Sequence, residues 1–282
     1  MRKPMQLRKA WEKIIIALAL FDYLTAAQVT RLLYALTSLT HVQEQMKLLV
    51  DNDLVITLGG KALDLPLIYA LSGTGRQYAY SLGAPVRKRY QLSEEQEKSR
   101  NPYFLKHTVA VTDVLIAAKL LAQAVPGIVL TRMSTERELR RTIYVELPER
   151  IGIEPDASVQ FRVQETWEDL FFIEVYRNLP PAEWRFKQKI QGYVVYLDSG
   201  HHEALFQTPA LTVMVVAETD RMAATLKRWA EDALQDIARP EEGEMFFFCS
   251  LAVATANPEE MFLSPVWEQA FSTTKTPLLV LE

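Results

Sequence analysis

Two predicted strands followed by a helix, between residues 151 and 197, constrain the fold of this chain more than any other segment. From Ile153 to Val163 the apolar residues of the second half recur at every second position, as they do in a half-buried strand. The segment from Asp169 to Arg177 is more apolar and contains one acid within its run, Glu174. A helical pattern from Ala182 to Leu197 follows. The order strand, strand, helix indicates a mixed α/β domain.

Glu174 is the residue of this segment that most needs an explanation. Strand alternation places it on one face with Phe172 and Tyr176, and places Phe171 and Ile173 on the other. If the two strands are neighbours, Asp156 of the first meets Glu174 at one end of the sheet, and two carboxylates form a hard oxygen site that suits Mg²⁺. An aspartate in a turn beside a hydrogen-bonded strand glutamate explains the same spacing equally well.

The pair Pro155-Asp156, followed by an acid on the next strand, resembles the restriction-endonuclease-like nuclease fold, whose second strand carries Glu-x-Lys. Here the lysine is missing, and Tyr176 stands in its place. The surrounding pattern predicts the order α-β-β-β-β-α-β, close to the core of that fold. Its elements are a helix at 104–124, strands at 128–133, around 142–147, 153–163 and 169–177, a helix at 182–197 and a strand at 211–217.

Length and composition allow two domains with substantial cores. The chain has 282 residues, of which 49% are hydrophobic. We find no apolar run of membrane-spanning length and no secretory pattern in the first thirty residues. The single cysteine, Cys249, excludes an internal disulfide, so the expected location is the cytoplasm.

Charge is distributed unevenly along the chain. Residues 1–100 have a formal charge of +5 and residues 101–282 one of −9, which together give the total of −4. The basic residues gather near the N-terminus and in one later triplet: Arg2, Lys3, Arg8, Lys9, and Arg87, Lys88 and Arg89. This asymmetry favours a DNA-contacting domain joined to an acidic one, and a solvated basic tail is the alternative.

Residues 1–82 show the pattern of a winged helix-turn-helix. Helices are predicted at 7–20, at 26–34 with Thr25 and Gln28 as a capping box, and from Ser38 or Thr40 to Val50. A hairpin of strands 54–58 and 66–71 would carry Lys61 at its tip, and Ser72 would cap a last helix, 75–82. The overall prediction is an α/β fold, α+β overall.

The third helix would read the major groove of duplex DNA. Its expected outward residues are His41, Gln43, Glu44, Gln45 and Lys47, with Thr40 at its start. The helix has no arginine, so Gln43 or Gln45 to adenine is the predicted base contact. Phosphate contacts are expected from Lys47, Lys61, Arg76 and the basic clusters, including Arg87, Lys88 and Arg89. A winged helix used only for protein contacts or dimerisation is the alternative.

Residues 83–103, with two prolines and a charged run, are predicted to be a linker, and residues 104–282 the second domain. Beyond the linker the chain resembles the replication-relaxation family. The resemblance rests on His107-x-x-x-Val111-x-Asp113-Val114, on Pro155-Asp156 and on Phe172-Ile173-Glu174-Val175-x-Arg177, and it extends from about residue 7 to 250. It implies a protein of plasmids and mobile elements with a winged helix and a nuclease-like domain. The family's second strand usually reads Glu-Val-Asp-Arg, and Tyr176 replaces its second acid here.

These patterns lead to one principal hypothesis and two alternatives. In the first, the winged helix binds double-stranded DNA, and the nuclease-like domain is an inactive scaffold without a cofactor that serves replication, mobilisation or transposition proteins. In the second, Asp156 and Glu174 bind Mg²⁺ in a DNA nickase, and Lys187 or Lys189 replaces the missing lysine. In the third, the chain is a transcriptional repressor that needs only its first 82 residues. Whether the protein is a homodimer is left open by the sequence.

Overall fold

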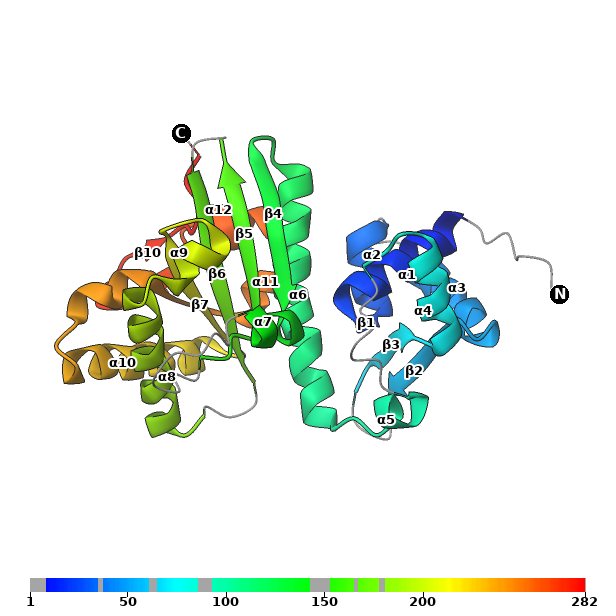
Figure 1. Cartoon of the computed structure of the whole chain (residues 1–282), viewed down its shortest axis with the longest axis horizontal. Coiled ribbons are helices and arrows are strands. Elements are labelled where there is room, and N and C mark those ends of the chain that lie inside the picture. Colours follow the sequence, from blue (N-terminus) through cyan, green and yellow to red (C-terminus); the bar gives the residue numbers. More distant parts are fainter. Residues whose placement is uncertain are drawn as a thin grey trace. The chain divides into compact units, whose positions relative to one another are not determined.

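The computed structural model describes residues 9–34, 38–60, 65–85, 93–142, 153–164, 167–177 and 181–281. It contains helices and two sheets, so the predicted α+β class is confirmed (Figure 1). The chain divides into two compact units, Met1–Thr112 and Asp113–Glu282. This division falls inside helix α6 (Pro102–Ala124), later than the predicted boundary at residue 104. None of the helices in the described ranges has both the length and the apolar character needed to cross a membrane.

Unit 1 combines short helices with a three-stranded antiparallel sheet. Its elements in chain order are α1 (Lys9–Phe21), β1 (Leu24–Thr25), α2 (Ala26–Leu33), α3 (Leu39–Asp51), β2 (Val55–Gly59), β3 (Leu67–Leu71), α4 (Gly73–Ser81) and α5 (Glu94–Lys98). The strand order in the sheet is β1-β3-β2. Every helix and strand predicted for residues 7–82 is present, with its ends shifted by a few residues.

Local side chains fix the ends of two helices in unit 1. The Thr25 hydroxyl accepts from the Gln28 amide at 3.2 Å, and the Gln28 side chain accepts in return from the Thr25 amide at 2.9 Å, so the predicted capping box is confirmed. Ser72 caps α4 through the Gly75 amide at 2.9 Å. A Cβ at Gly75 would lie 1.8 Å from the carbonyl oxygen of Leu54, so this close approach requires glycine.

Part of the segment predicted as a linker belongs to the folded unit 1, so that prediction is corrected. Residues 94–98 form α5, and Glu97 is the buried residue of this helix. The Tyr23 hydroxyl donates to Glu97 at 2.5 Å, and the Arg100 guanidinium lies 3.6 Å from the same carboxylate. Because these partners compensate the buried charge, a charged sequence can pack against the unit 1 sheet.

Unit 2 is built on a seven-stranded mixed sheet. The strands lie in the order β10 (Lys275–Thr276), β9 (Trp267–Gln269), β8 (Phe246–Ser250), β7 (Leu211–Ala217), β6 (Trp167–Tyr176), β5 (Ala157–Val163) and β4 (Ile128–Thr135). The pairs β6–β7 and β7–β8 are parallel, and the others are antiparallel. The helical elements are α7 (Glu136–Thr142), α8 (Glu183–Asp198), α9 (His201–Phe206), α10 (Asp220–Asp236), η4 (Pro240–Met245), α11 (Leu251–Ala256) and α12 (Pro258–Leu263).

One predicted strand of unit 2 lies almost entirely outside the described residues. Of the strand expected around 142–147, only Thr142 is described, and it is the last residue of helix α7. Acidic and basic residues of α7 are spaced for helical pairing, and Arg140 lies 2.7 Å from Glu136 one turn earlier. Among the described residues, the order of elements before β7 is α6-β4-α7-β5-β6-α8-α9.

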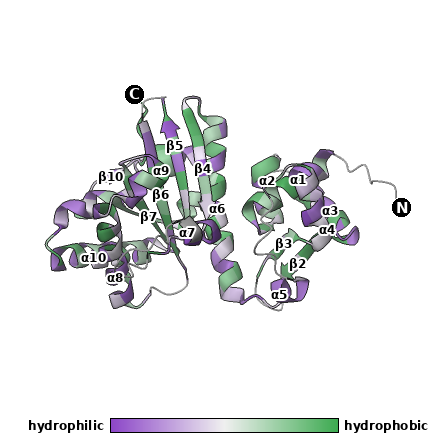
Figure 2. Cartoon of the chain, viewed as in Figure 1, coloured by the Kyte–Doolittle hydropathy of each residue, from purple (hydrophilic) through white to green (hydrophobic). Residues whose placement is uncertain are grey.

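The alternation predicted for β6 is confirmed. On one face, the Phe161 ring packs edge-on against Phe171 at 6.0 Å and Phe262 at 5.3 Å. On the other, Phe172 packs against Tyr193 of α8 within the core formed with α8 and α10. Figure 2 shows the apolar residues on the central strands and polar residues on α10. Both faces of the sheet are covered, so Glu174 lies in an apolar layer.

Candidate functional site

The predicted acidic pair of unit 2 comes together at the carboxyl end of β6. Strand β5 begins directly after Asp156 and pairs with β6 in an antiparallel register that sets Ala157 opposite Ile173. The Asp156 amide donates to the Ile173 carbonyl oxygen at 2.9 Å, and its carboxylate accepts from the Val175 amide at 2.7 Å. Asp156 thus extends the β5–β6 pairing by one residue and lies beside Glu174.

Helix α8 supplies two partners to Glu174. Lys189 and Tyr193 are four residues apart and therefore lie on the same face of the helix. The Lys189 ammonium donates to one oxygen of the Glu174 carboxylate, and the Tyr193 hydroxyl donates to the other. Lys189 also donates to the Glu154 carbonyl oxygen at 3.0 Å. We call Asp156, Glu174, Lys189 and Tyr193 the Glu174 cluster.

Burial dominates the electrostatics of the Glu174 cluster. Glu174 is 2% exposed, and this burial raises the pKa of its carboxyl to about 7; Lys189 opposes the rise, and the nearby Asp156 adds to it. Burial disfavours the charged form of Lys189, yet the carboxylates of Glu174 and Asp156 hold its pKa above the usual value. Burial also raises the pKa of Tyr193 well above its usual value. Lys189 and Tyr193 therefore keep their protons at neutral pH, and Glu174 releases its proton only near pH 7.

The structure separates the two lysines that the sequence could not distinguish. Lys189 contacts Glu174, whereas Lys187 lies on another face of α8 and pairs with Glu183 at 3.0 Å and Asp232 at 3.4 Å. Tyr176, at the position of the missing lysine, is half-buried against the same core, and desolvation of its hydroxyl raises its pKa well above the usual value. A cation beside the acidic pair is thus present, supplied by Lys189 from the helix.

The two carboxylates as placed do not fit Mg²⁺. Mg²⁺ requires near-octahedral oxygen ligands and keeps several waters, which needs open carboxylate oxygens. Both oxygens of Glu174 are engaged by its own chain, one of them by an ammonium group that would repel the metal ion. Across the described residues, no group of three or more His, Cys, Asp or Glu side chains could hold a metal ion. The arrangement is that of a satisfied buried ion pair.

In unit 1, helix α3 presents polar side chains to solvent. Val42, Met46 and Leu49 are fully buried, which turns the opposite side of the helix outward. The outward residues are Thr40, His41, Gln43, Glu44 and Lys47, which we call the α3 face. These five side chains are exposed, as their helical spacing predicts.

Gln45 is placed otherwise than predicted, and the predicted phosphate contact at Arg76 stays a prediction. Gln45 is 6% exposed and accepts a hydrogen bond from the Trp11 indole at 2.7 Å, so its predicted outward orientation is wrong. Arg76 is half-buried, and its guanidinium donates to the Leu71 carbonyl oxygen at 3.1 Å. Both side chains are held by unit 1 itself. The predicted contacts at Lys61, Arg87, Lys88 and Arg89 lie outside the described residues.

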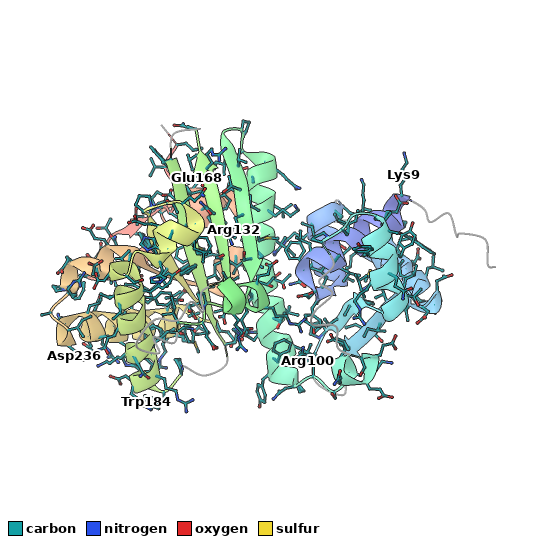
Figure 3. The ribbon with its side chains drawn as sticks, viewed as in Figure 1. Lys9, Arg100, Arg132, Glu168, Trp184 and Asp236 are labelled. Carbon is teal, nitrogen blue, oxygen red and sulfur yellow. The ribbon has the colours of Figure 1, made fainter. Side chains whose placement is uncertain are left out.

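Sequence reasoning did not single out two residues of α8, Tyr193 and Trp184. Tyr193 follows Lys189 at the helical spacing that puts both beside Glu174, and this spacing was a usable signal. Trp184 is 62% exposed in the first turn of α8, with the Arg185 guanidinium 5.1 Å from its ring (Figure 3). An exposed tryptophan has no signature in the sequence, because helical periodicity does not mark it.

The fold and the cluster define a protein of two α/β units, one with an exposed polar helix and one with a buried carboxylate–lysine pair. The chain belongs to the replication-relaxation family, whose model matches residues 17–208. It is thereby placed among proteins related to replication or mobilisation. Comparison with curated proteins and with solved structures gives no match. The family match ends before β7, so the last part of the sheet lies beyond it.

Proposed function

We propose that this chain is a double-stranded DNA-binding protein of a plasmid or mobile element, acting in replication or mobilisation. In this proposal unit 1 is a winged helix that holds the DNA, and unit 2 is a nuclease-like domain that serves as a scaffold for partner proteins. The observation that carries the proposal is the α3 face, a row of exposed polar side chains on a helix whose other side is fully buried.

The order of elements in unit 1 supports the winged-helix assignment. Helices α1, α2 and α3 precede the hairpin of β2 and β3, and β1 pairs with β3 to complete the sheet. In helix-turn-helix proteins the recognition helix enters the major groove and its outward residues contact base edges. On the α3 face, Gln43 is the side chain suited to adenine, through a bidentate pair of hydrogen bonds.

Charge supports a phosphate-contacting role for unit 1. Lys47 is exposed at the C-terminal end of the α3 face, and residues 1–100 have a formal charge of +5. Lys61, between the two strands of the hairpin, is the candidate contact from the wing. Lysine contacts to phosphate supply affinity without reading sequence, and Gln43 would add the base contact.

The Glu174 cluster supports a structural role for unit 2. An active two-carboxylate site needs its acids open to metal and substrate. Here Lys189 and Tyr193 occupy both oxygens of a glutamate that is 2% exposed. The cluster instead ties β6 to α8, because a buried carboxylate that keeps both partners anchors the helix to the sheet.

Salt-dependent binding tests the DNA-binding proposal. The full chain is titrated against a labelled duplex of mixed sequence at several salt concentrations. Each phosphate contact contributes about −0.9 to the slope of log affinity against log salt, so binding should weaken steeply with salt. Replacing Lys47 and Lys61 by alanine should weaken binding to all sequences and flatten the slope. Salt-independent binding, or no binding to any duplex at low salt, contradicts the proposal.

A plasmid cleavage assay tests the scaffold proposal. Supercoiled DNA is incubated with the full chain and Mg²⁺ or Mn²⁺, and neither nicking nor linearisation is expected. Asp156→Ala should leave duplex binding at the parent level. Nicking that is lost in both Asp156→Ala and Glu174→Ala would establish the nickase alternative, and Lys189→Ala against Lys187→Ala would then show which lysine acts. Cleavage that survives Asp156→Ala points to a contaminating nuclease, which a repurified sample removes.

A further inference from the structure

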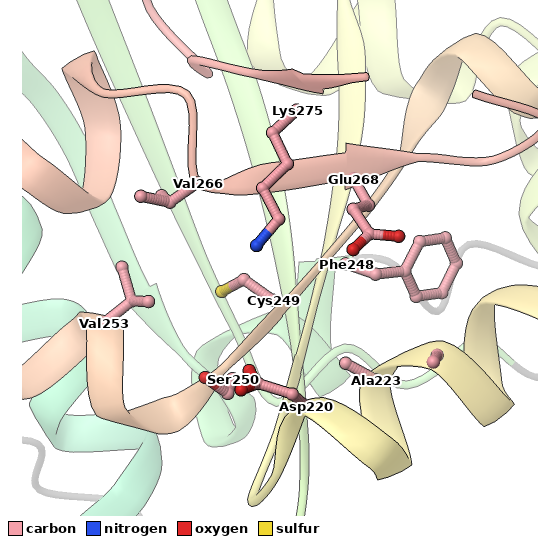
Figure 4. A pocket seen from close by; sticks show the side chains of 10 residues that line it. Asp220, Ala223, Phe248, Cys249, Ser250, Val253, Val266, Glu268 and Lys275 are labelled. Carbon is pink, nitrogen blue, oxygen red and sulfur yellow. The ribbon is translucent and has the colours of Figure 1, made fainter. Parts of the chain in front are cut away.

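A cavity of about 250 Å³ opens in unit 2 at the carboxyl end of strand β8, which pairs in parallel with β7 (Figure 4). Its polar lining comes from four elements: Asp220 of α10, Cys249 and Ser250 of β8, Glu268 of β9 and Lys275 of β10. In open α/β sheets, ligands bind outside the carboxyl ends of the strands. All of these residues lie beyond the segment that matches the family, and none belongs to the Glu174 cluster.

Two buried polar side chains of the cavity make no hydrogen bond within the described part of the chain. Ser250 is 8% exposed and stands at the N-cap position of α11, but its hydroxyl caps none of the described amides there. Cys249 is a free thiol, 5% exposed. Figure 4 shows the Lys275 side chain extending from β10 toward the Cys249 sulfur, with Asp220 and Ser250 on the opposite side. The Ser250 hydroxyl is therefore able to donate to or accept from a polar group of a ligand in the cavity.

The cavity presents one positive and one negative charge to a ligand. Glu268 is neutralised by Lys227, whose ammonium lies 3.1 Å from its carboxylate. Among the described residues, Lys275 and Asp220 form no ion pair, either with each other or with another side chain. Burial raises the pKa of the Cys249 thiol; Asp220 adds to the rise and Lys275 opposes it, so both charges act on the thiol. The thiol is therefore protonated at neutral pH and reacts slowly with electrophiles.

We propose that this cavity binds a small zwitterion of the α-amino acid class. The ligand's carboxylate would pair with Lys275 and its ammonium group with Asp220, while Ser250 would hydrogen bond to one of the two. Val253 and Val266 would contact a small apolar side chain. Pockets for larger organic ligands measure about 300–1,000 Å³, so a volume of about 250 Å³ suits a ligand of the size of an amino acid.

The single cysteine of the chain provides a direct test. The rate of Cys249 alkylation by iodoacetamide is measured on the full chain with each of the twenty L-amino acids, and calorimetric titration of the same pairs reports binding independently of thiol reactivity. Occupancy shields the thiol, so a binding amino acid at ten times its Kd should slow alkylation about tenfold. Isobutylamine and isobutyrate each carry only one of valine's two charges. They should therefore slow the alkylation of Cys249 far less than valine does.

Variants decide whether the protection arises in this cavity. Lys275→Gln and Asp220→Asn should each abolish protection and binding heat. Arg228→Gln removes a positive charge from an exposed side chain of α10 that does not line the cavity, and should leave both unchanged. The proposal is overturned if none of the twenty amino acids protects Cys249 or gives binding heat, or if protection persists equally in Lys275→Gln and Asp220→Asn.

Discussion

The α3 face of unit 1 and the Glu174 cluster of unit 2 both gather polar side chains, and they differ in what those side chains contact. On the α3 face the side chains point to solvent from a helix whose other side is buried. In the Glu174 cluster, Lys189 and Tyr193 satisfy both oxygens of the carboxylate. Exposed polar groups remain available to a partner, whereas satisfied buried ones contribute to the fold.

Two residues of the same type at neighbouring positions of one helix can differ in burial and in partners, and their residue type does not show which is which. Gln43 and Gln45 lie two positions apart on α3 and have the same chemistry, yet one is exposed and the other accepts from Trp11 in the core. Lys187 and Lys189 lie two positions apart on α8, and only Lys189 contacts Glu174. Each pair provides a matched control, because the two members differ in burial or partner and share their residue type.

The largest expected effect is the loss of the Lys189 ammonium. Lys189→Met leaves the Glu174 carboxylate buried without its cation, and breaking a buried pair in this way costs about 3–5 kcal/mol. Urea denaturation of the full chain above pH 7 should show unit 2 unfolding at a lower urea concentration. Lys187→Met should unfold close to the parent, because its ion pairs are at the surface.

A second substitution sharpens this result. Adding Glu174→Gln to Lys189→Met removes the uncompensated charge and should recover part of the lost stability, which a double-mutant cycle measures. If Lys189→Met and Lys187→Met unfold at the same urea concentration, the Glu174 cluster does not stabilise the fold.

The pH dependence of stability is the next effect. The carboxyl of Glu174 has a pKa of about 7 in the folded protein, against 4.5 for an ordinary glutamate. Between these values the folded state holds a proton that the unfolded state has released, so the contribution of Glu174 to stability falls as pH rises from about 4.5 to about 7 and then levels off. The measurement is the free energy of unfolding of the parent minus that of Glu174→Gln across this range. A difference that rises with pH would show that the ion pair with Lys189 outweighs burial.

A smaller effect separates the two glutamines of α3. Gln45→Ala leaves the buried Trp11 indole without its acceptor and should lower the free energy of unfolding by about 1–3 kcal/mol. Gln43→Ala should change stability by less than about 0.5 kcal/mol, since its side chain is exposed, and should weaken duplex binding. Urea unfolding and duplex titration of both variants make the comparison. A Gln43→Ala protein that binds DNA as the parent does would remove Gln43 from the interface.

The features of the fold that depend on neighbouring residues could be predicted from the sequence. The capping box joins Thr25 and Gln28, which are three positions apart, and the face shared by Phe172, Glu174 and Tyr176 follows from strand alternation. Features that depend on partners far away in the sequence could not be predicted in this way. Gln45 accepts a hydrogen bond from Trp11, 34 positions away, and Glu97 accepts one from Tyr23, 74 positions away. The sequence identified both acids of the Glu174 cluster, but only the orientation of α8 decided between Lys187 and Lys189.

One binding measurement tests the central claim that the α3 face holds DNA and the Glu174 cluster does not. The affinity of the full chain for one mixed-sequence duplex is compared at about 50 mM and about 200 mM salt for the parent, Lys47→Ala and Asp156→Ala. If Lys47 contacts one phosphate, Lys47→Ala should bind more weakly than the parent at the lower salt. The ratio of the parent's affinity to that of Lys47→Ala should be about threefold smaller at the higher salt. Asp156→Ala should match the parent at both concentrations. Unchanged binding by Lys47→Ala together with weakened binding by Asp156→Ala would contradict the account.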